Sequence, residues 1–116
     1  MRHLESKLQQ AMVKWFRLRH PDLMLFHIPN GGKRSPITAR ILKAEGVLPG
    51  VADLFLMHPN EKYNGLWIEV KTDKGRQSEH QKHFEKVSTR EGYMYQVCKS
   101  LQEFNQLIDN YLNNTL

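Results

Sequence analysis

Two short apolar runs, each interrupted by charge, constrain the fold of this chain most. The first is VADLFLM at residues 51–57, and the second is LWIEVKT at residues 66–72. The loop between them is rich in Pro, Asn and Gly, so the pattern predicts an antiparallel strand pair. Asp53 lies within the first run and Glu69 within the second. A carboxylate in such a position is costly to bury unless it is paired or binds a metal ion.

Strand geometry predicts that these charges meet. Side chains alternate between the faces of a strand, so Glu69 and Lys71 point to one face while Ile68 and Val70 point to the other. Paired strands lie about 4.8 Å apart, so Asp53 can approach Glu69. Two carboxylates can hold Mg²⁺ through oxygens at roughly 2.1 Å and leave room for water and a phosphate. With an ammonium group beside them, they form a site suited to phosphodiester hydrolysis.

These residues resemble a known nuclease signature. Asp53 followed by Glu69-Val70-Lys71 is similar to the D…(D/E)xK motif of the PD-(D/E)xK nuclease superfamily. Within it, the chain most resembles the virus-type replication-repair nuclease family, VRR-NUC, and the resemblance extends over nearly the whole sequence. The matching segments are Glu5 with Gln9, Asn30-Gly31-Gly32, Pro49-Gly50-Val51-Ala52-Asp53-Leu54, Glu69-Val70-Lys71, and Ser78 with Gln81. Ala52 stands where the family usually has Pro, which leaves the acidic residue after it intact.

The resemblance implies an α/β fold with a restriction-endonuclease-like core, in which helices flank a mixed central sheet. It also implies a DNA endonuclease that depends on Mg²⁺ or Mn²⁺ and leaves a 5′-phosphate and a 3′-hydroxyl. The implied roles are metal binding by Asp53, Glu69 and the Val70 carbonyl, assistance to the attacking water by Lys71, and completion of the site by Glu5 and Gln81.

The resemblance further implies a substrate and an assembly. Standalone members of the family can act as homodimers on branched DNA such as four-way junctions, where two active sites cut two strands symmetrically. We therefore expect a homodimer that cuts branched DNA during phage or mobile-element replication and repair. A domain of this size has no room for a separate sequence-reading module, so recognition should depend on phosphates and DNA shape.

The charge balance favours an anionic partner. The chain has 17 Lys and Arg against 12 Asp and Glu, a formal net charge of +5. One predicted phosphate-binding region is the loop Asn30-Gly31-Gly32-Lys33-Arg34, followed by a helix with Ser35 as N-cap and Pro36 as first residue. Lys74 and Arg76 precede a second basic helix and form another such region. The alternative is that both regions are ordinary exposed segments, a turn and a helix in contact with solvent, because such segments have the same composition.

Further elements follow from periodicity. Residues 3–19 are predicted to be a helix, residues 23–28 and 93–98 strands, and residues 36–44 and 78–90 helices, with a last helix after Ser100. The predicted apolar stripe of the first helix is Leu4, Leu8, Ala11, Met12 and Trp15. By spacing alone, Glu5 beside this stripe is a solvated residue. Ser78 and Gln81 have capping-box spacing, which by itself explains both, and Ser100 with Glu103 repeats the pattern.

Length and composition limit the remaining possibilities. A chain of 116 residues, 40% of them hydrophobic, is expected to form one domain over residues 1–116. It has no apolar run near the ~20 residues of a membrane helix and no apolar signal segment, so we expect no membrane association and a cytoplasmic location. The family resemblance implies that this is the cytoplasm of a bacterium or a phage-infected host. A non-catalytic DNA-binding adaptor with the nuclease fold is the alternative function, and an RNA-directed enzyme is a third.

Overall fold

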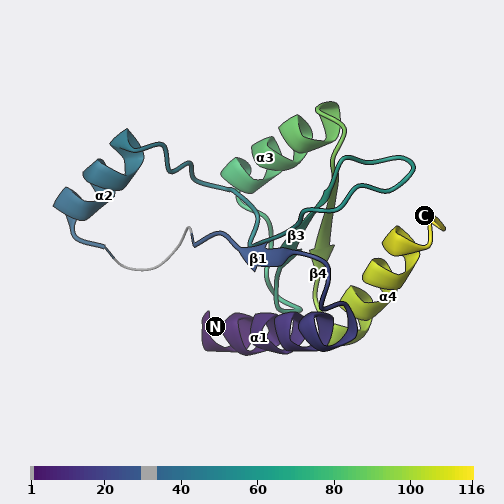
Figure 1. The fold of residues 1–116 in the computed structure, drawn as a ribbon. Coiled ribbons are helices and arrows are strands. Elements are labelled where there is room, and N and C mark those ends of the chain that lie inside the picture. Colours follow the sequence, from purple (N-terminus) through teal and green to yellow (C-terminus); the bar gives the residue numbers. More distant parts are fainter. Residues whose placement is uncertain (1, 30–33) are drawn as a thin grey trace.

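The chain folds around one four-stranded sheet with helices on both faces (Figure 1). A computed structural model describes residues 2–29 and 34–116. The strands are β1 (Leu25–His27), β2 (Leu54–Leu56), β3 (Leu66–Val70) and β4 (Met94–Cys98), in the spatial order β1-β2-β3-β4. The helices are α1 (Arg2–Arg19), α2 (Pro36–Ala44), α3 (Glu79–Arg90) and α4 (Leu101–Leu112). None of the described helices is both long enough and apolar enough to cross a bilayer.

The predicted antiparallel pair is confirmed and forms the centre of the sheet. β2 pairs with β3 so that Leu54 lies opposite Ile68. β1 joins β2 in antiparallel orientation, whereas β3 and β4 are parallel and are connected through α3, as a parallel neighbour requires. Both central strands are shorter than predicted. Asp53 therefore directly precedes β2, and Lys71 directly follows β3.

One face of the sheet packs on α1 and α4, and the core lies between them. Met12 and Phe16 of α1 and Phe104 of α4 are fully buried there. The predicted stripe of α1 is wrong at its first position, because Leu4 is 61% exposed. The first turns of α1 border a cavity instead of covering the sheet, so the buried stripe begins later and includes Phe16.

The opposite face carries a row of aromatic side chains beneath α3. Phe26, Phe55, Trp67 and Tyr95 lie beside one another in the strand register, one on each strand. The ring centroids of Phe55 and Trp67 are 4.3 Å apart, and Phe84 of α3 contacts Trp67 edge-on at 4.9 Å. Because side chains alternate along a strand, the residue two positions before Phe55 and the residues two and four positions after Trp67 face the same side. Asp53, Glu69 and Lys71 are those residues.

Capping explains where the helices begin. Ser35 caps α2 with Pro36 as first residue, and Ser78 and Gln81 form a complete capping box at α3, as predicted. At α4 the Ser100 hydroxyl accepts from the Glu103 N–H, as predicted, but the Glu103 carboxylate accepts from the N–H of Lys99 instead of Ser100. The reciprocal half of that box is thus displaced by one residue.

Candidate active site

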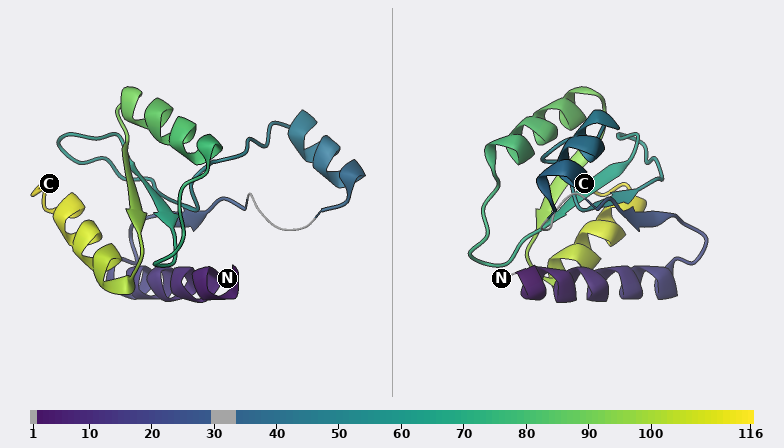
Figure 2. Two further views of the ribbon diagram at one scale, coloured as in Figure 1. Left: turned by 180° about the vertical axis from the view of Figure 1, so that it is seen from behind. Right: turned by 90° about the vertical axis from the view of Figure 1, so that its left-hand side faces the viewer.

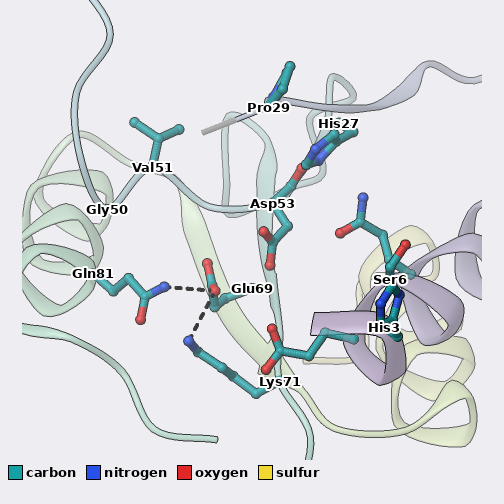
Figure 3. Close-up of a pocket in the computed structure, with 12 residues that line it drawn as sticks. His3, Ser6, His27, Pro29, Gly50, Val51, Asp53, Glu69, Lys71 and Gln81 are labelled. Atoms are coloured by element: carbon teal, nitrogen blue, oxygen red, sulfur yellow. Dashed lines mark hydrogen bonds and ion pairs between the residues drawn. The ribbon is translucent and has the colours of Figure 1, made fainter. Parts of the chain in front are cut away.

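The predicted catalytic residues meet at a cavity of about 550 Å³, where strands β1 and β3 end and β2 begins (Figure 3). Asp53, Glu69 and Lys71 contribute from the sheet, Glu5 from α1 and Gln81 from α3. These five residues are separated by as many as 76 positions in the sequence, from Glu5 to Gln81. The fold therefore brings together all the side chains that the resemblance assigned to catalysis.

Asp53 is fixed by hydrogen bonds to both neighbouring strands. Its Oδ2 accepts from the Val70 N–H at 2.8 Å. Its backbone carbonyl accepts from the Ile28 N–H at 3.0 Å, and His27 Nδ1 lies 2.6 Å from the same oxygen, so this ring nitrogen carries the proton. The Val70 side chain lies in the core, and its carbonyl as a metal ligand stays a prediction. Asp53 thus has its backbone tied to one strand and its carboxylate tied to the other.

Glu69 is a buried carboxyl group, and its side chain lacks full pairing. Only 3% of the residue is exposed. Its Oε2 accepts from Gln81 Nε2 at 2.9 Å and lies 3.6 Å from Lys71 Nζ. Its Oε1 is buried and has no hydrogen-bond partner within the described residues. Burial, as the largest cause, and the Asp53 charge together raise the pKa of Glu69 from 4.5 to about 8, although the nearby Lys71 charge lowers it.

Gln81 links the start of α3 to Glu69. Its side-chain oxygen accepts from the Ser78 N–H at 2.8 Å, while its amide nitrogen donates to Glu69. The capping explanation is thus confirmed, and the contact of Gln81 with Glu69 fits the predicted site role, which stays a prediction. Gly50 allows α3 to lie this close to the site, since its φ is +89° and a Cβ there would meet the His80 carbonyl at 2.4 Å.

The donor groups fit a divalent cation that completes its coordination with water and phosphate. Mg²⁺ is commonly bound through one or two carboxylates, with the other positions taken by water and substrate oxygens. Asp53 and Glu69 offer two carboxylates, and the unpartnered Glu69 Oε1 is a buried oxygen that a cation would satisfy. Within the residues the structure describes, no group of three or more His, Cys, Asp or Glu side chains is arranged to hold a metal ion. Glu5 lines the cavity, and its part in metal binding stays a prediction.

The predicted phosphate-binding residues that the structure describes lie outside the cavity lining. Arg34, Lys74 and Arg76 are exposed on the segments that precede α2 and α3. The predicted residues Asn30, Gly31, Gly32 and Lys33 lie outside the described part of the chain. Sequence reasoning assigned no role to His3, Ser6 and His27, which also line the cavity. The spacing of His3 and Ser6 around Glu5 on one helix is the signal that could have indicated them.

The buried state of Glu69 predicts a specific dependence of stability on pH in the metal-free protein. Because its pKa is raised from 4.5 to about 8, the folded state binds a proton more tightly than the unfolded state. The free energy of unfolding should therefore fall as the pH rises across this window, and should be unaffected by Glu69 below it. Glu69→Gln removes this loss. We expect its Tm to exceed that of the wild type more at about pH 9 than at about pH 5.

The control for this experiment is Glu61→Gln, which neutralises an exposed carboxylate on the β2–β3 loop. Its Tm difference from the wild type should stay nearly constant over the same pH range. Tm is measured by thermal unfolding in the presence of a chelator. If Tm changed with pH in the same way for the wild type and for Glu69→Gln, the raised pKa assigned to Glu69 would be wrong.

Comparisons with known proteins agree with this architecture. A solved structure described as a VRR_NUC domain protein superimposes with a TM-score of 0.78, at 23% identity, over 94% of this chain and 88% of that one. The predicted fold class, a mixed sheet flanked by helices in a restriction-endonuclease-like core, is thereby confirmed. No curated protein matches the sequence significantly. The model of the VRR-NUC domain matches residues 2–102, and the chain therefore belongs to the VRR-NUC domain family.

Proposed function

We propose that this nuclease-type domain is a DNA endonuclease dependent on Mg²⁺ or Mn²⁺, with its active site in the cavity around Asp53 and Glu69. Membership of the VRR-NUC family supports nuclease chemistry and DNA as the substrate. The observation that carries the proposal is the convergence of a buried carboxyl, a second carboxylate and an ammonium group in one cavity. Such a set is suited to attack of water on a phosphodiester.

The contacts in the cavity, together with the family resemblance, give each residue a role. Asp53 and Glu69, with the Val70 carbonyl, would hold the cation, and Glu5 would complete the site from α1. When bound, the cation supplies charge neutralisation at the phosphate and lowers the pKa of water. Gln81 keeps the Glu69 carboxylate in one orientation through its hydrogen bond.

Lys71 supplies the positive charge of the site. Its side chain is 13% exposed, and its ammonium group lies 3.6 Å from Glu69 Oε2. At this position it orients the attacking water and stabilises the negative charge that develops on the phosphate in the transition state. In-line attack then gives a 5′-phosphate and a 3′-hydroxyl.

Branched DNA is the proposed substrate. The exposed Arg34, Lys74 and Arg76 can contact phosphates on either side of the cut strand, which gives affinity without reading bases. We propose that the whole chain, residues 1–116, acts as one domain and as a homodimer in the cytoplasm of a bacterium or phage-infected host. Two sites related by twofold symmetry would make paired cuts in a four-way junction.

A substrate panel tests this proposal. Labelled four-way junctions, flaps, linear duplex, single-stranded DNA and the matching RNAs are incubated with Mg²⁺ or Mn²⁺. We expect the junction to be cut fastest and at symmetric positions. Preferential cutting of RNA would assign the site to RNA, and equal rates on the junction and linear duplex would remove the selectivity for branches.

A further inference from the structure

Helix α2 stands away from the body of the domain (Figures 1 and 2). Among the described elements it contacts no other helix or strand, and it buries none of its residues. A helix of only nine residues is marginal by itself in water. Its exposure therefore indicates a surface that acts on something outside the domain. We call residues 34–49, which include this helix, the arm.

In the sequence, residues of the active-site cavity flank the arm on both sides. Pro29, which precedes it in sequence, and Gly50 and Val51, which follow it, line the catalytic cavity. A nucleic acid whose cleaved strand lies in the cavity must pass beside the base of the arm. The arm therefore extends outward from one side of the cavity, where DNA that continues beyond the cleavage point can reach it (Figure 1).

The helix presents two different surfaces. Ile37 and Ile41 are one turn apart, so they share a face, and they are 63% and 51% exposed. Arg40 and Lys43 are exposed on the neighbouring face, and α2 contains no acidic residue. One face is thus apolar and the adjoining one cationic.

Nucleic acid fits both surfaces of α2 better than the same helix of a second copy would. Arg40 and Lys43 have no acidic neighbour on α2, so the cationic face attracts phosphates and repels the α2 helix of another copy. Proteins that bind distorted DNA also insert apolar side chains against base steps, while cations contact the adjoining phosphates. At a branch point a base-pair plane becomes uncovered beside phosphates when two DNA arms unstack, whereas in continuous duplex the planes stay covered by stacking.

We propose that the arm determines selectivity for branched DNA. Ile37 and Ile41 pack against the base pair exposed at the branch, and Arg40 and Lys43 contact the phosphates next to it. This inference rests on the proposed nuclease function, since it takes DNA at the cavity as its starting point. It assigns selectivity to the apolar face and general affinity to the cationic face.

The test measures binding separately from cleavage. In a Lys71→Ala background, with Mg²⁺ present, fluorescence anisotropy gives the Kd for a four-way junction and for a linear duplex of the same sequence. Ile37→Ala/Ile41→Ala removes apolar surface and keeps good helix formers. We expect junction affinity to fall by roughly tenfold while duplex affinity is unchanged.

Three further variants complete the design. Ile37→Leu/Ile41→Leu retains apolar surface and should keep the wild-type preference for the junction. Arg40→Gln/Lys43→Gln should weaken binding to the junction and to the duplex alike. It should also reduce the slope of log affinity against log salt concentration by about 1 to 2. Leu18→Ala truncates an apolar residue that is 76% exposed on α1, and it should change neither affinity.

The outcomes separate this inference from the proposed nuclease function. If Ile37→Ala/Ile41→Ala changed the affinity for the junction and the duplex equally, or changed neither, the proposed role of the arm would be overturned, even if the wild type cleaves DNA. Conversion of a dimer to a monomer by the same truncation, seen by sedimentation, would assign the apolar face to a second copy and also overturn it. If the wild type cut no substrate, the proposed nuclease function would be wrong. The ratio of the Kd values for junction and duplex would still test the role of the arm.

Discussion

Asp53→Asn should abolish DNA cleavage while leaving the fold intact. The substitution removes one of two carboxylates in the cavity, so the loss should be roughly a thousandfold or more, as for other groups that stabilise transition-state charge. The fold should survive, because an Asn side-chain oxygen can still accept from the Val70 N–H, as Asp53 Oδ2 does at 2.8 Å. The measurement is the rate of junction cleavage over a range of Mg²⁺ concentrations, together with the Tm.

The matched control is Asp73→Asn, which changes an exposed aspartate on the loop after β3. It should retain wild-type cleavage. A near-normal rate for Asp53→Asn at saturating Mg²⁺ would remove Asp53 from the reaction. A collapse of its Tm would show that the residue serves the fold instead.

Lys71→Met is expected to lower kcat by roughly a hundredfold to ten-thousandfold with little change in KM. Methionine retains an apolar side chain of similar length and removes the ammonium group, which lies 3.6 Å from Glu69 Oε2. The group acts on charge that develops only in the transition state, so its removal should affect the chemical step more than substrate binding. Single-turnover rates for the junction report on the chemical step, and KM for the junction shows whether substrate binding has changed.

Lys74→Met is the control for charge alone, because Lys74 is exposed on the neighbouring loop and lies outside the cavity lining. It should raise KM slightly and leave kcat unchanged. If Lys71→Met also changed only KM, Lys71 would be a phosphate-binding residue without a role in the transition state.

Local patterns were sufficient to predict most of the fold. The strand pair around Asp53 and Glu69 follows from apolar runs and turn residues, and the starts of α2 and α3 follow from their capping serines. The length of the strands could not be predicted, because hydrogen bonds across the sheet decide where pairing ends. The exposure of Leu4 was missed for a similar reason, since periodicity gives the face of a helix but not which turns cover the sheet.

The candidate site was predictable only in part. Strand alternation places Glu69 and Lys71 on one face, and the pairing brings Asp53 beside them. No spacing argument could bring Glu5 of α1 to the same cavity, because that contact depends on how the helix packs against the sheet. The family resemblance provided that prediction. The contact of His27 with the Asp53 carbonyl and the isolation of α2 had no signal in the sequence.

Metal-dependent cleavage at this cavity is the central claim, and a single time course tests it most directly. A labelled four-way junction is mixed with the wild type in EDTA, and excess Mg²⁺ is then added, with Asp53→Asn treated in parallel. We predict no cleavage before the addition, paired symmetric cuts with 5′-phosphate ends after it, and none in the variant. Equal cleavage in EDTA or by the variant would contradict the claim, and binding without cleavage would leave a non-catalytic DNA-binding module.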